Sequence, residues 1–383
     1  MRVVAVTGEA SGDLIAADAL ARFKAAHPAA ELAGIGGKRL SDIGMDCWFT
    51  SDDLAVRGYV EALSKLVHIL SVRYWLCEYI DKWKPGLYLG VDAPDFNLGV
   101  EARLRAKGIR TVHLISPSIW AWRPERIVNI QRAVDHMLCI FPFEPDVYKG
   151  TGVRATYVGH PIADLIPPVS DRQAARAALG LSSGRPVVAV LPGSRPGEIR
   201  HNGAAFFGAA HRLARVADVI IPASSPAIAD RIRRHPGFAP LEAAGVRLLP
   251  QPQASGAPVS HTAMAACDVA LVASGTATLE VALHKRPMVI AYRVPQLTYS
   301  LMKRRALISD IGLPNILLGQ RVVPELVQSQ ATAETLAQAV LEWVDHPSRC
   351  ANVEQQFSQL HEQLRRGAAA RVAEILHDDY RRR

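Results

Sequence analysis

Short apolar runs rich in β-branched residues alternate with longer helical patterns along most of the chain. RVVAV (2–6) and GLYLGV (86–91) have this character in the first half, and PVVAVLP (186–192) and DVALVAS (268–274) have it in the second. Such alternation is typical of βα units, in which helices cross back over a parallel sheet. The sequence therefore predicts an α/β protein.

The chain of 383 residues is too long for one core and fits domains of roughly 100–200 residues each. LIPPVSDR (165–172) places two prolines and a serine between the two series, as a linker does. We therefore expect two Rossmann-like domains facing a cleft, over residues 1–168 and 169–349. Residues 350–383 belong to a helical tail and are expected to pack back on the first domain.

The composition excludes several classes of protein. The five cysteines are scattered, without a CxxC pair or zinc spacing, so neither a disulfide framework nor a structural metal is expected. The net charge of +8 comes from dispersed basic residues without a recognised module, so nucleic acid is not an expected partner. No apolar stretch approaches the ~20 residues that span a bilayer. We expect a cytoplasmic protein that meets membranes only from the side.

A small-residue turn follows the first strand of the second series. LPGSR (191–195) ends that strand and leads into a predicted helix. Helix N-termini present unpaired N–H groups and the positive end of the helix dipole, so they bind phosphate readily. Arg195 adds a planar guanidinium group suited to two phosphate oxygens. Gly193, Ser194 and Arg195 are therefore candidate phosphate ligands, and an ordinary βα turn is the alternative.

A second turn of the same kind lies further along. ASGTATLE (273–280) places Ser274, Gly275 and Thr276 between a strand and a helix. Glu280 lies one turn into that helix, where it either complements the helix dipole or accepts hydrogen bonds from ribose hydroxyls. Two such loops in one domain predict a site for a nucleoside diphosphate. Neither loop has the Walker A or the GxGxxG spacing.

Two acids bracket a proline at the end of a predicted strand in the first half. GVDAPDFN (90–97) places Asp92 before Pro94 and Asp95 after it. Proline ends the strand because it lacks an N–H group, and loops at strand ends carry the chemistry of α/β proteins. One carboxylate is therefore a candidate base. The alternative is that one acid caps the following helix and the other is solvated.

Short segments in a fixed order span most of the chain. They are GEASGD (8–13), GIGG (34–37), DAPDFN (92–97), SPSIWAWR (116–123), FPFE (141–144), GHP (159–161), LPGSR (191–195), ASGTATLE (273–280), MVIAYR (288–293), LPN (313–315) and VPELVQ (323–328). Together they resemble the lipid-A-disaccharide synthase family, which are inverting glycosyltransferases with two Rossmann-like domains in the GT-B arrangement.

The resemblance implies a reaction. It is the transfer of 2,3-diacylglucosamine from its UDP derivative to 2,3-diacylglucosamine 1-phosphate (lipid X), with inversion at the anomeric carbon. The products would be the β-1,6-linked lipid A disaccharide 1-phosphate and UDP, in lipopolysaccharide biosynthesis. The family reaction uses no metal, so no cofactor is expected. The resemblance also implies a peripheral enzyme at the cytoplasmic face of the inner membrane of Gram-negative bacteria, and it suggests a homodimer.

The resemblance also implies roles for single residues. Asp92, in preference to Asp95, would be the base that accepts the proton of the acceptor 6-hydroxyl. Arg195 would stabilise the charge that builds on the diphosphate as the glycosidic bond breaks. The nucleotide and donor would be contacted by Gly193, Ser194, Arg195, Ser274, Gly275, Thr276, Glu280 and Asn315, and the acceptor side by Glu9, Ser11, Gly12 and Asp13.

EALSKLVHILSVRYWLCEYIDKWK (61–84) is a long helical pattern that ends at a proline. Apolar residues lie along it at helical spacing, with basic residues between them. One interpretation is a helix that buries a wide face in the first domain. The other is an interfacial helix near anionic lipid, which the acyl chains of both substrates favour. On the second interpretation, the membrane and acyl contacts come from Leu63, Leu66, Val67 and Leu70.

Two other functions fit the same pattern. A different UDP-sugar enzyme of this architecture, such as an epimerase or a transferase with a soluble acceptor, would use residues 61–84 as core. A non-catalytic peripheral membrane protein that senses a nucleotide would tolerate the loss of Asp92. Fold alone does not separate these functions, so the choice rests on the site residues and on the matched segments.

Overall fold

A computed structural model describes residues 1–381, apart from residues 55–61, 182–183 and 252–257. The side chains of Ala10 and of residues 62–66 also lie outside the described part.

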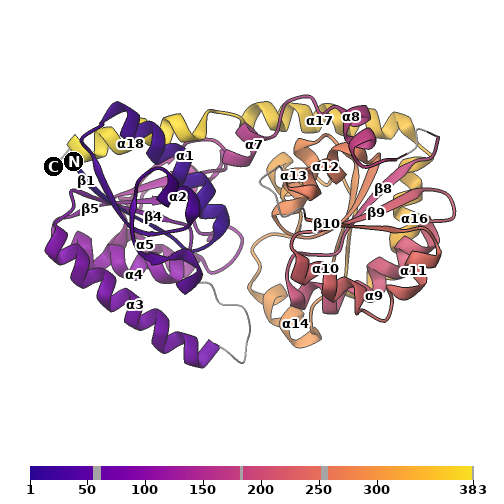
Figure 1. Cartoon of the computed structure of the whole chain (residues 1–383), viewed down its shortest axis with the longest axis horizontal. Coiled ribbons are helices and arrows are strands. Elements are labelled where there is room, and N and C mark those ends of the chain that lie inside the picture. The colour runs from indigo at the N-terminus through magenta and orange to yellow at the C-terminus, as the bar shows by residue number, and fades with distance from the viewer. Residues whose placement is uncertain (55–61, 182–183, 252–257, 382–383) are drawn as a thin grey trace. The chain divides into compact units, whose positions relative to one another are not determined.

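The described residues form two compact units (Figure 1). The first consists of Met1–Asp164 and Gln363–Arg383, and the second of Leu165–Glu362. The first boundary thus lies four residues before the predicted one at 168, and the chain returns to the first unit at Gln363, where residue 350 was expected.

The described residues of the first unit form a seven-stranded parallel sheet in the order β3-β2-β1-β4-β5-β6-β7. The order reverses at β1, which has β2 on one side and β4 on the other. Such a reversal opens a crevice at the carboxyl ends of the strands, where α/β sheets bind ligands. The strands are β1 (Arg2–Thr7), β2 (Glu31–Gly36), β3 (Asp46–Thr50), β4 (Leu87–Val91), β5 (Arg110–Leu114), β6 (His136–Cys139) and β7 (Arg154–Tyr157).

Both faces of this sheet are buried. Val3 and Ala5 lie in one apolar cluster, and Val4 and Val6 lie in another. A strand buried on both faces has no polar alternation, which is why RVVAV stands out as an unbroken apolar run. The helices around the sheet are α1 (Ala10–Ala26), α2 (Lys38–Asp42), α3 (Ala62–Trp83), α4 (Pro94–Arg105), α5 (Ile127–Ala133), α6 (Glu144–Val147) and α18 (Ala368–Arg381), with 3₁₀ turns at Ser51–Asp53 and Pro124–Arg126.

The C-terminal helix α18 packs against α1 and β5 of the first unit (Figure 1). Its buried Asp379 forms ion pairs with the first residue of each of three strands: His136 of β6, Arg110 of β5 at 3.0 Å and Arg154 of β7 at 3.3 Å. These contacts lie at the amino ends of the strands, opposite the crevice. They tie α18 to the sheet, as expected for the end of the chain.

The described residues of the second unit form a six-stranded parallel sheet in the order β10-β9-β8-β11-β12-β13, which reverses at β8. Its core includes Phe206, Phe207 and Trp343. The strands are β8 (Val187–Leu191), β9 (Asp218–Ala223), β10 (Arg247–Pro250), β11 (Val269–Ala273), β12 (Met288–Tyr292) and β13 (Glu325–Val327). The helices are α8 (Arg172–Ala178), α9 (Pro196–Leu213), α10 (Pro226–Arg233), α11 (Ala239–Ala243), α12 (Val259–Ala266), α13 (Thr276–Leu283), α14 (Gln296–Arg305), α15 (Leu313–Leu318) and α16 (Ala333–Val344), with a 3₁₀ turn at Gln328–Gln330. Two further helices contain residues of both units: α7 (Pro161–Leu165) and α17 (Pro347–Leu364).

Candidate functional site

In the first unit, candidate site residues lie where β1 and β4 end side by side. Thr7 of β1 pairs with Val91 of β4, so the turns after the two strands begin at the same level of the sheet. A Cβ atom on Gly8 would lie 2.5 Å from the Cβ atom of Ala93, so the two turns are in contact. Gly12 is less tightly packed, since a Cβ atom on it would lie at an ordinary contact distance of 3.5 Å from Val91. The GEASGD and DAPDFN segments therefore meet at the crevice.

Asp92 is half-buried in a strained turn. Asp92 and Ala93 both have left-handed backbone conformations, with φ of 51° and 44°. The N–H of Asp92 donates to the carbonyl of Leu114 at 2.9 Å, and the Asn97 side-chain amide donates to the Asp92 carbonyl at 2.8 Å. Within the described part of the chain, the Asp92 carboxylate has no hydrogen-bond or ion-pair partner. Strain of this kind persists at functional sites where the surroundings impose it.

Asp95 has different surroundings. It lies in the first turn of α4, its side chain is 83% exposed, and it forms an ion pair with Arg126. A carboxylate that is solvated and paired with a cation is a weak base. The geometry therefore favours Asp92 over Asp95 as the base.

The residues predicted on the acceptor side fall into two groups. Glu9 and Ser11 are exposed at the start of α1. Asp13 is only 4% exposed, and its carboxylate accepts the N–H groups of Gly37 at 2.6 Å and Arg39 at 3.1 Å. Asp13 therefore anchors the turn before α2 and does not offer a free carboxylate to a substrate. Glu9 and Ser11 remain as reachable side chains.

Glu144 joins two other loops at this edge of the sheet. Its carboxylate accepts the N–H groups of Ile140 at 3.1 Å and Phe141 at 3.0 Å, and the indole N–H of Trp120 at 3.2 Å. Burial raises the pKa of Glu144 to about 7. Sequence reasoning missed this role, for which the available signal was an acid directly after the FPF turn at a strand end.

In the second unit, candidate site residues lie in the turn between β8 and α9. Gly193 has a φ of 131°, and a Cβ atom there would lie 2.4 Å from the Cβ atom of Glu198. Glu198 Oε2 accepts the N–H groups of Ser194 at 2.8 Å and Arg195 at 3.1 Å. In this structure Glu198 occupies these N–H groups, and their binding of phosphate stays a prediction. The Arg195 side chain is exposed and is what this turn offers to an anion.

The turn between β11 and α13 is more open. Gly275 has a φ of 153°, and the Ser274 hydroxyl donates to the carbonyl of Ile311 at 2.7 Å. Among the described residues, no side chain caps the N-terminus of α13, which begins at Thr276. The first N–H groups of the helix therefore lack a side-chain acceptor, and the helix dipole makes this end positive. Of the two turns, this one has the backbone that suits a phosphate.

Glu280 is held by a histidine. Its Oε2 lies 3.3 Å from Nε2 of His261 on α12. The His261 ring contacts His284, whose pKa burial lowers to about 3, so that His284 is neutral at pH 7. His261 thus fixes one oxygen of the Glu280 carboxylate and leaves Oε1 for another partner. Sequence reasoning missed His261, which is distant from the ASGTATLE segment along the chain.

Asn315 is fully buried and fully hydrogen-bonded within the second unit. Its Nδ2 donates to the carbonyl of Val323 at 2.9 Å and to Glu325 Oε1 at 2.8 Å. Its Oδ1 accepts the N–H groups of Val322 at 2.9 Å and Val323 at 3.1 Å. These hydrogen bonds order the loop between α15 and β13. The expected nucleotide contact of Asn315 stays a prediction.

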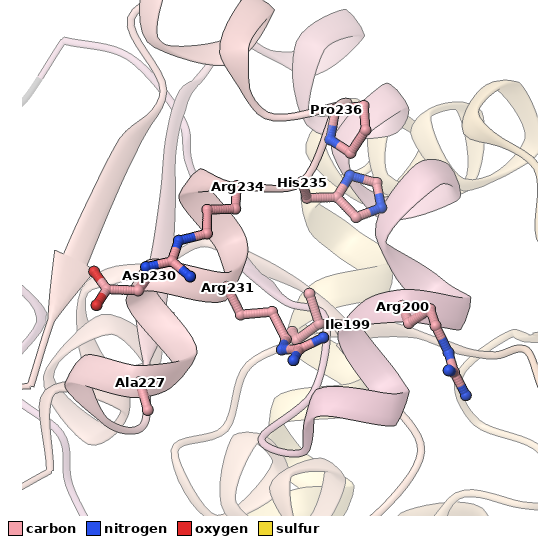
Figure 2. A pocket seen from close by; sticks show the side chains of 8 residues that line it. All are labelled: Ile199, Arg200, Ala227, Asp230, Arg231, Arg234, His235 and Pro236. Atoms are coloured by element: carbon pink, nitrogen blue, oxygen red, sulfur yellow. The ribbon is translucent and has the colours of Figure 1, made fainter.

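A pocket of about 460 Å³ lies between α9 and α10 of the second unit (Figure 2). The carboxylate in its lining, Asp230, is paired with Arg233 at 3.1 Å, so the lining has a surplus of positive charge. One lining residue, Ile199, is four residues after Arg195 along the chain, and a positively charged lining attracts anions. The lining residues are Ile199, Arg200, Ala227, Asp230, Arg231, Arg234, His235 and Pro236.

Helix α3 has two apolar faces. Val72, Leu76 and Ile80 are buried in the core of the first unit. Val67 and Leu70 are 70% and 43% exposed. The helix therefore supplies core packing and an apolar surface together. The other large apolar side chains that it exposes are Tyr74, Trp75 and Tyr79.

The side chains of Leu63 and Leu66, predicted to make the same contacts, lie outside the described residues. Among the described helices, none is long and apolar enough to cross a membrane.

Comparison with known sequences gives a match over nearly the whole chain. The family model described as lipid-A-disaccharide synthetase matches residues 3–378. The lipid-A-disaccharide synthase of Albidiferax ferrireducens is 48% identical over 373 residues, which cover 96% of this chain and 94% of the relative. The synthase of Thiobacillus denitrificans is 48% identical over 371 residues, covering 96% and 97%.

Solved structures share the fold at low identity. The UDP-GlcNAc 2-epimerase from Neisseria meningitidis, bound to UDP-GlcNAc, gives a TM-score of 0.59 at 11% identity and covers 100% of both chains. Anabaena Alr3699/HepE in complex with UDP-glucose gives a TM-score of 0.60 at 14% identity, covering 99% of this chain and 100% of that one. These likenesses confirm the predicted architecture of two Rossmann-like domains.

Proposed function

This chain belongs to the lipid-A-disaccharide synthetase family, and we propose that it joins UDP-2,3-diacylglucosamine to 2,3-diacylglucosamine 1-phosphate. The products are the β-1,6-linked disaccharide 1-phosphate and UDP. The observation that carries the proposal is the family match, which includes the candidate site residues of both units. The rival function of a UDP-sugar epimerase rests on likeness in fold alone, at 11% identity.

Asp92 acts as the general base in this proposal. The 6-hydroxyl oxygen of the acceptor attacks C1 of the donor sugar, and its proton passes to the Asp92 carboxylate. Three observations support this role: the carboxylate lacks a partner among the described residues, the turn is strained, and Asp95 is engaged by Arg126. Glu9 and Ser11, exposed beside the same crevice, contact the acceptor.

The second unit binds the UDP group in this proposal. The bond from C1 to the diphosphate oxygen breaks, and UDP leaves with the electron pair. Arg195 stabilises the charge that develops on the diphosphate, and the N-terminus of α13 at Gly275 and Thr276 binds a phosphate. Glu280, oriented by His261, accepts hydrogen bonds from the ribose hydroxyls.

We also propose that the exposed face of α3 docks on the cytoplasmic surface of the inner membrane. Val67, Leu70 and Trp75 are exposed there, with Lys82 and Arg73 on the same helix. Apolar side chains with basic neighbours suit an anionic lipid interface, and both substrates carry acyl chains that lie in a bilayer.

The suggested homodimer is testable by sedimentation velocity of the detergent-free protein.

The reaction is tested by product analysis. Incubation with both lipids in mixed micelles is expected to give UDP and a tetra-acylated disaccharide 1-phosphate, identified by mass spectrometry. Formation of a different sugar nucleotide from the donor would indicate an epimerase and overturn the proposal.

A further inference from the structure

Glu101 and His113 form a buried pair beneath the Asp92 turn. Both side chains are 0% exposed, and Glu101 Oε1 lies 2.7 Å from His113 Nδ1. In the register of β4 and β5, His113 is opposite Gly90, two residues before Asp92. The pair therefore lies at the point from which the chain enters the turn.

Helix α4 connects this pair to the turn. A Cβ atom on Gly90 would lie 2.1 Å from Glu101 Oε1 and 3.2 Å from the Cβ atom of Asn97, so both side chains rest against β4. Asn97 and Glu101 are four residues apart and share one face of α4. Asn97 Nδ2 donates to the carbonyl of Asp92 at 2.8 Å, while its Oδ1 accepts the hydroxyl of Tyr88 at 2.8 Å.

Such a pair is costly to bury. An apolar pair of similar volume often packs in a core at lower cost. Glu101 Oε2 and His113 Nε2 also lack hydrogen-bond partners among the described residues. Burial raises the pKa of Glu101, and the interaction with His113 opposes that shift. A buried polar group of this kind requires an explanation. The left-handed turn at Asp92 and Ala93 adjoins the pair on β4, and Ile115, two residues after His113, is also left-handed, with a φ of 76°.

We propose that Glu101 and His113 are positioning residues for Asp92. The pair fixes α4 against β4 and β5, Asn97 transmits that constraint to the Asp92 carbonyl, and the strained turn directs the carboxylate. Strained backbone persists where its surroundings over-determine it, and a misplacement of about 1 Å costs roughly 100-fold in rate. The inference rests on the proposed role of Asp92 as the base.

The first test measures UDP release with Glu101→Gln and His113→Gln. Each is expected to lower kcat by between about 10-fold and 100-fold, with the KM for the UDP-sugar unchanged. Asp379→Asn is the matched control, because it breaks another buried carboxylate–histidine pair in the same sheet at the opposite strand ends. It is expected to lower the melting temperature and to leave kcat unchanged.

The second test combines Glu101→Gln with Asp92→Asn. If Glu101 acts through Asp92, adding Glu101→Gln to Asp92→Asn causes no further loss of kcat. Losses that add, or a Glu101→Gln protein that melts earlier with unchanged kcat, would overturn the inference and leave the base assignment standing. Full activity of Asp92→Asn alone would overturn the base assignment, and this inference with it.

A third measurement does not depend on activity. The N–H of Asp92, which donates to Leu114, is expected to exchange its hydrogen faster in His113→Gln than in the unmodified protein or in Asp379→Asn. Because this measurement uses His113→Gln, it tests the inference even if Glu101→Gln does not fold. Equal exchange rates in all three proteins would contradict the inference.

Discussion

The carboxylate of Glu198 accepts the peptide N–H of Ser194 at 2.8 Å, so the N-terminus of α9 already holds an anion. The same oxygen accepts the N–H of Arg195 at 3.1 Å, so two hydrogen bonds from Glu198 fix the backbone of the turn. The Arg195 guanidinium group is the part of the turn that we propose binds the diphosphate.

Glu198→Ala should release this turn. The Kd for UDP is expected to rise about tenfold, a loss of about 1.4 kcal/mol, because Arg195 loses the backbone conformation that fixes its position. Glu198→Gln is the control, since its amide oxygen still accepts both N–H groups, and it should bind nearly as well as the unmodified protein. Calorimetric titration with UDP measures both variants. Tighter binding by Glu198→Ala would instead show that Glu198 competes with the phosphate.

His261→Ala tests the support of Glu280. Loss of this ion-pair contact, worth up to about 1 kcal/mol, is expected to weaken UDP binding about fivefold. His261→Gln can still donate to the carboxylate and should recover much of that affinity. His346→Ala, at an exposed histidine in the same unit, serves as the control and should bind UDP normally. Unchanged UDP affinity in His261→Ala would contradict the role given to this pair.

Asp379 should make the stability of the first unit depend on pH. Burial alone would raise the pKa of Asp379, but its hydrogen bonds and charge contacts with His136 and Arg110 hold the pKa below the ordinary value. A depressed pKa in the folded state means that the carboxylate stabilises the fold above the unfolded-state pKa, near 4, and loses that contribution as the pH falls through the folded-state pKa.

The measurement compares Asp379→Asn with the unmodified protein by urea unfolding at several pH values. The free energy of unfolding is expected to be lower by about 3 kcal/mol at pH 7, because the cations lose a buried partner. The difference should shrink as the pH is lowered below about 4. A difference that stays constant over this range would contradict the assignment.

Much of the architecture could be predicted from the sequence. The unbroken apolar runs indicated strands buried on both faces, and the small-residue turns at Gly193 and Gly275 do lie between a strand and a helix, as their motifs predicted. The strand-end position of Asp92 was also readable, because Pro94 ends the strand.

The contacts between distant segments could not be predicted. Whether a polar side chain faces a ligand or a neighbouring turn depends on the register of strands and helices far apart along the chain. Asn315 and Asp13 look like site residues in their motifs, yet each is satisfied by backbone groups of another turn. Glu101 and His113 carry no local signal, because each is one polar residue among other polar and apolar residues of its element.

The exposed face of α3 should contribute to lipid binding. Val67→Ser combined with Trp75→Ser is expected to lower binding to vesicles that contain phosphatidylglycerol at least tenfold, since burial of each side chain is worth about 1.5–3 kcal/mol. UDP release in detergent micelles should persist. Val169→Ser, at an 84% exposed valine outside α3, is the control. Equal sedimentation of all three proteins with the vesicles would contradict a docking role for α3.

UDP release in detergent–lipid micelles is the most direct measurement of whether Asp92 is the base of a transfer between two lipids. The unmodified protein and Asp92→Asn are each supplied with the UDP-sugar, with and without the monosaccharide 1-phosphate. UDP release is expected to require both lipids and to be at least about 100-fold lower in Asp92→Asn. Equal release from the two proteins would remove Asp92 from the mechanism, and release with the donor alone would indicate a hydrolase.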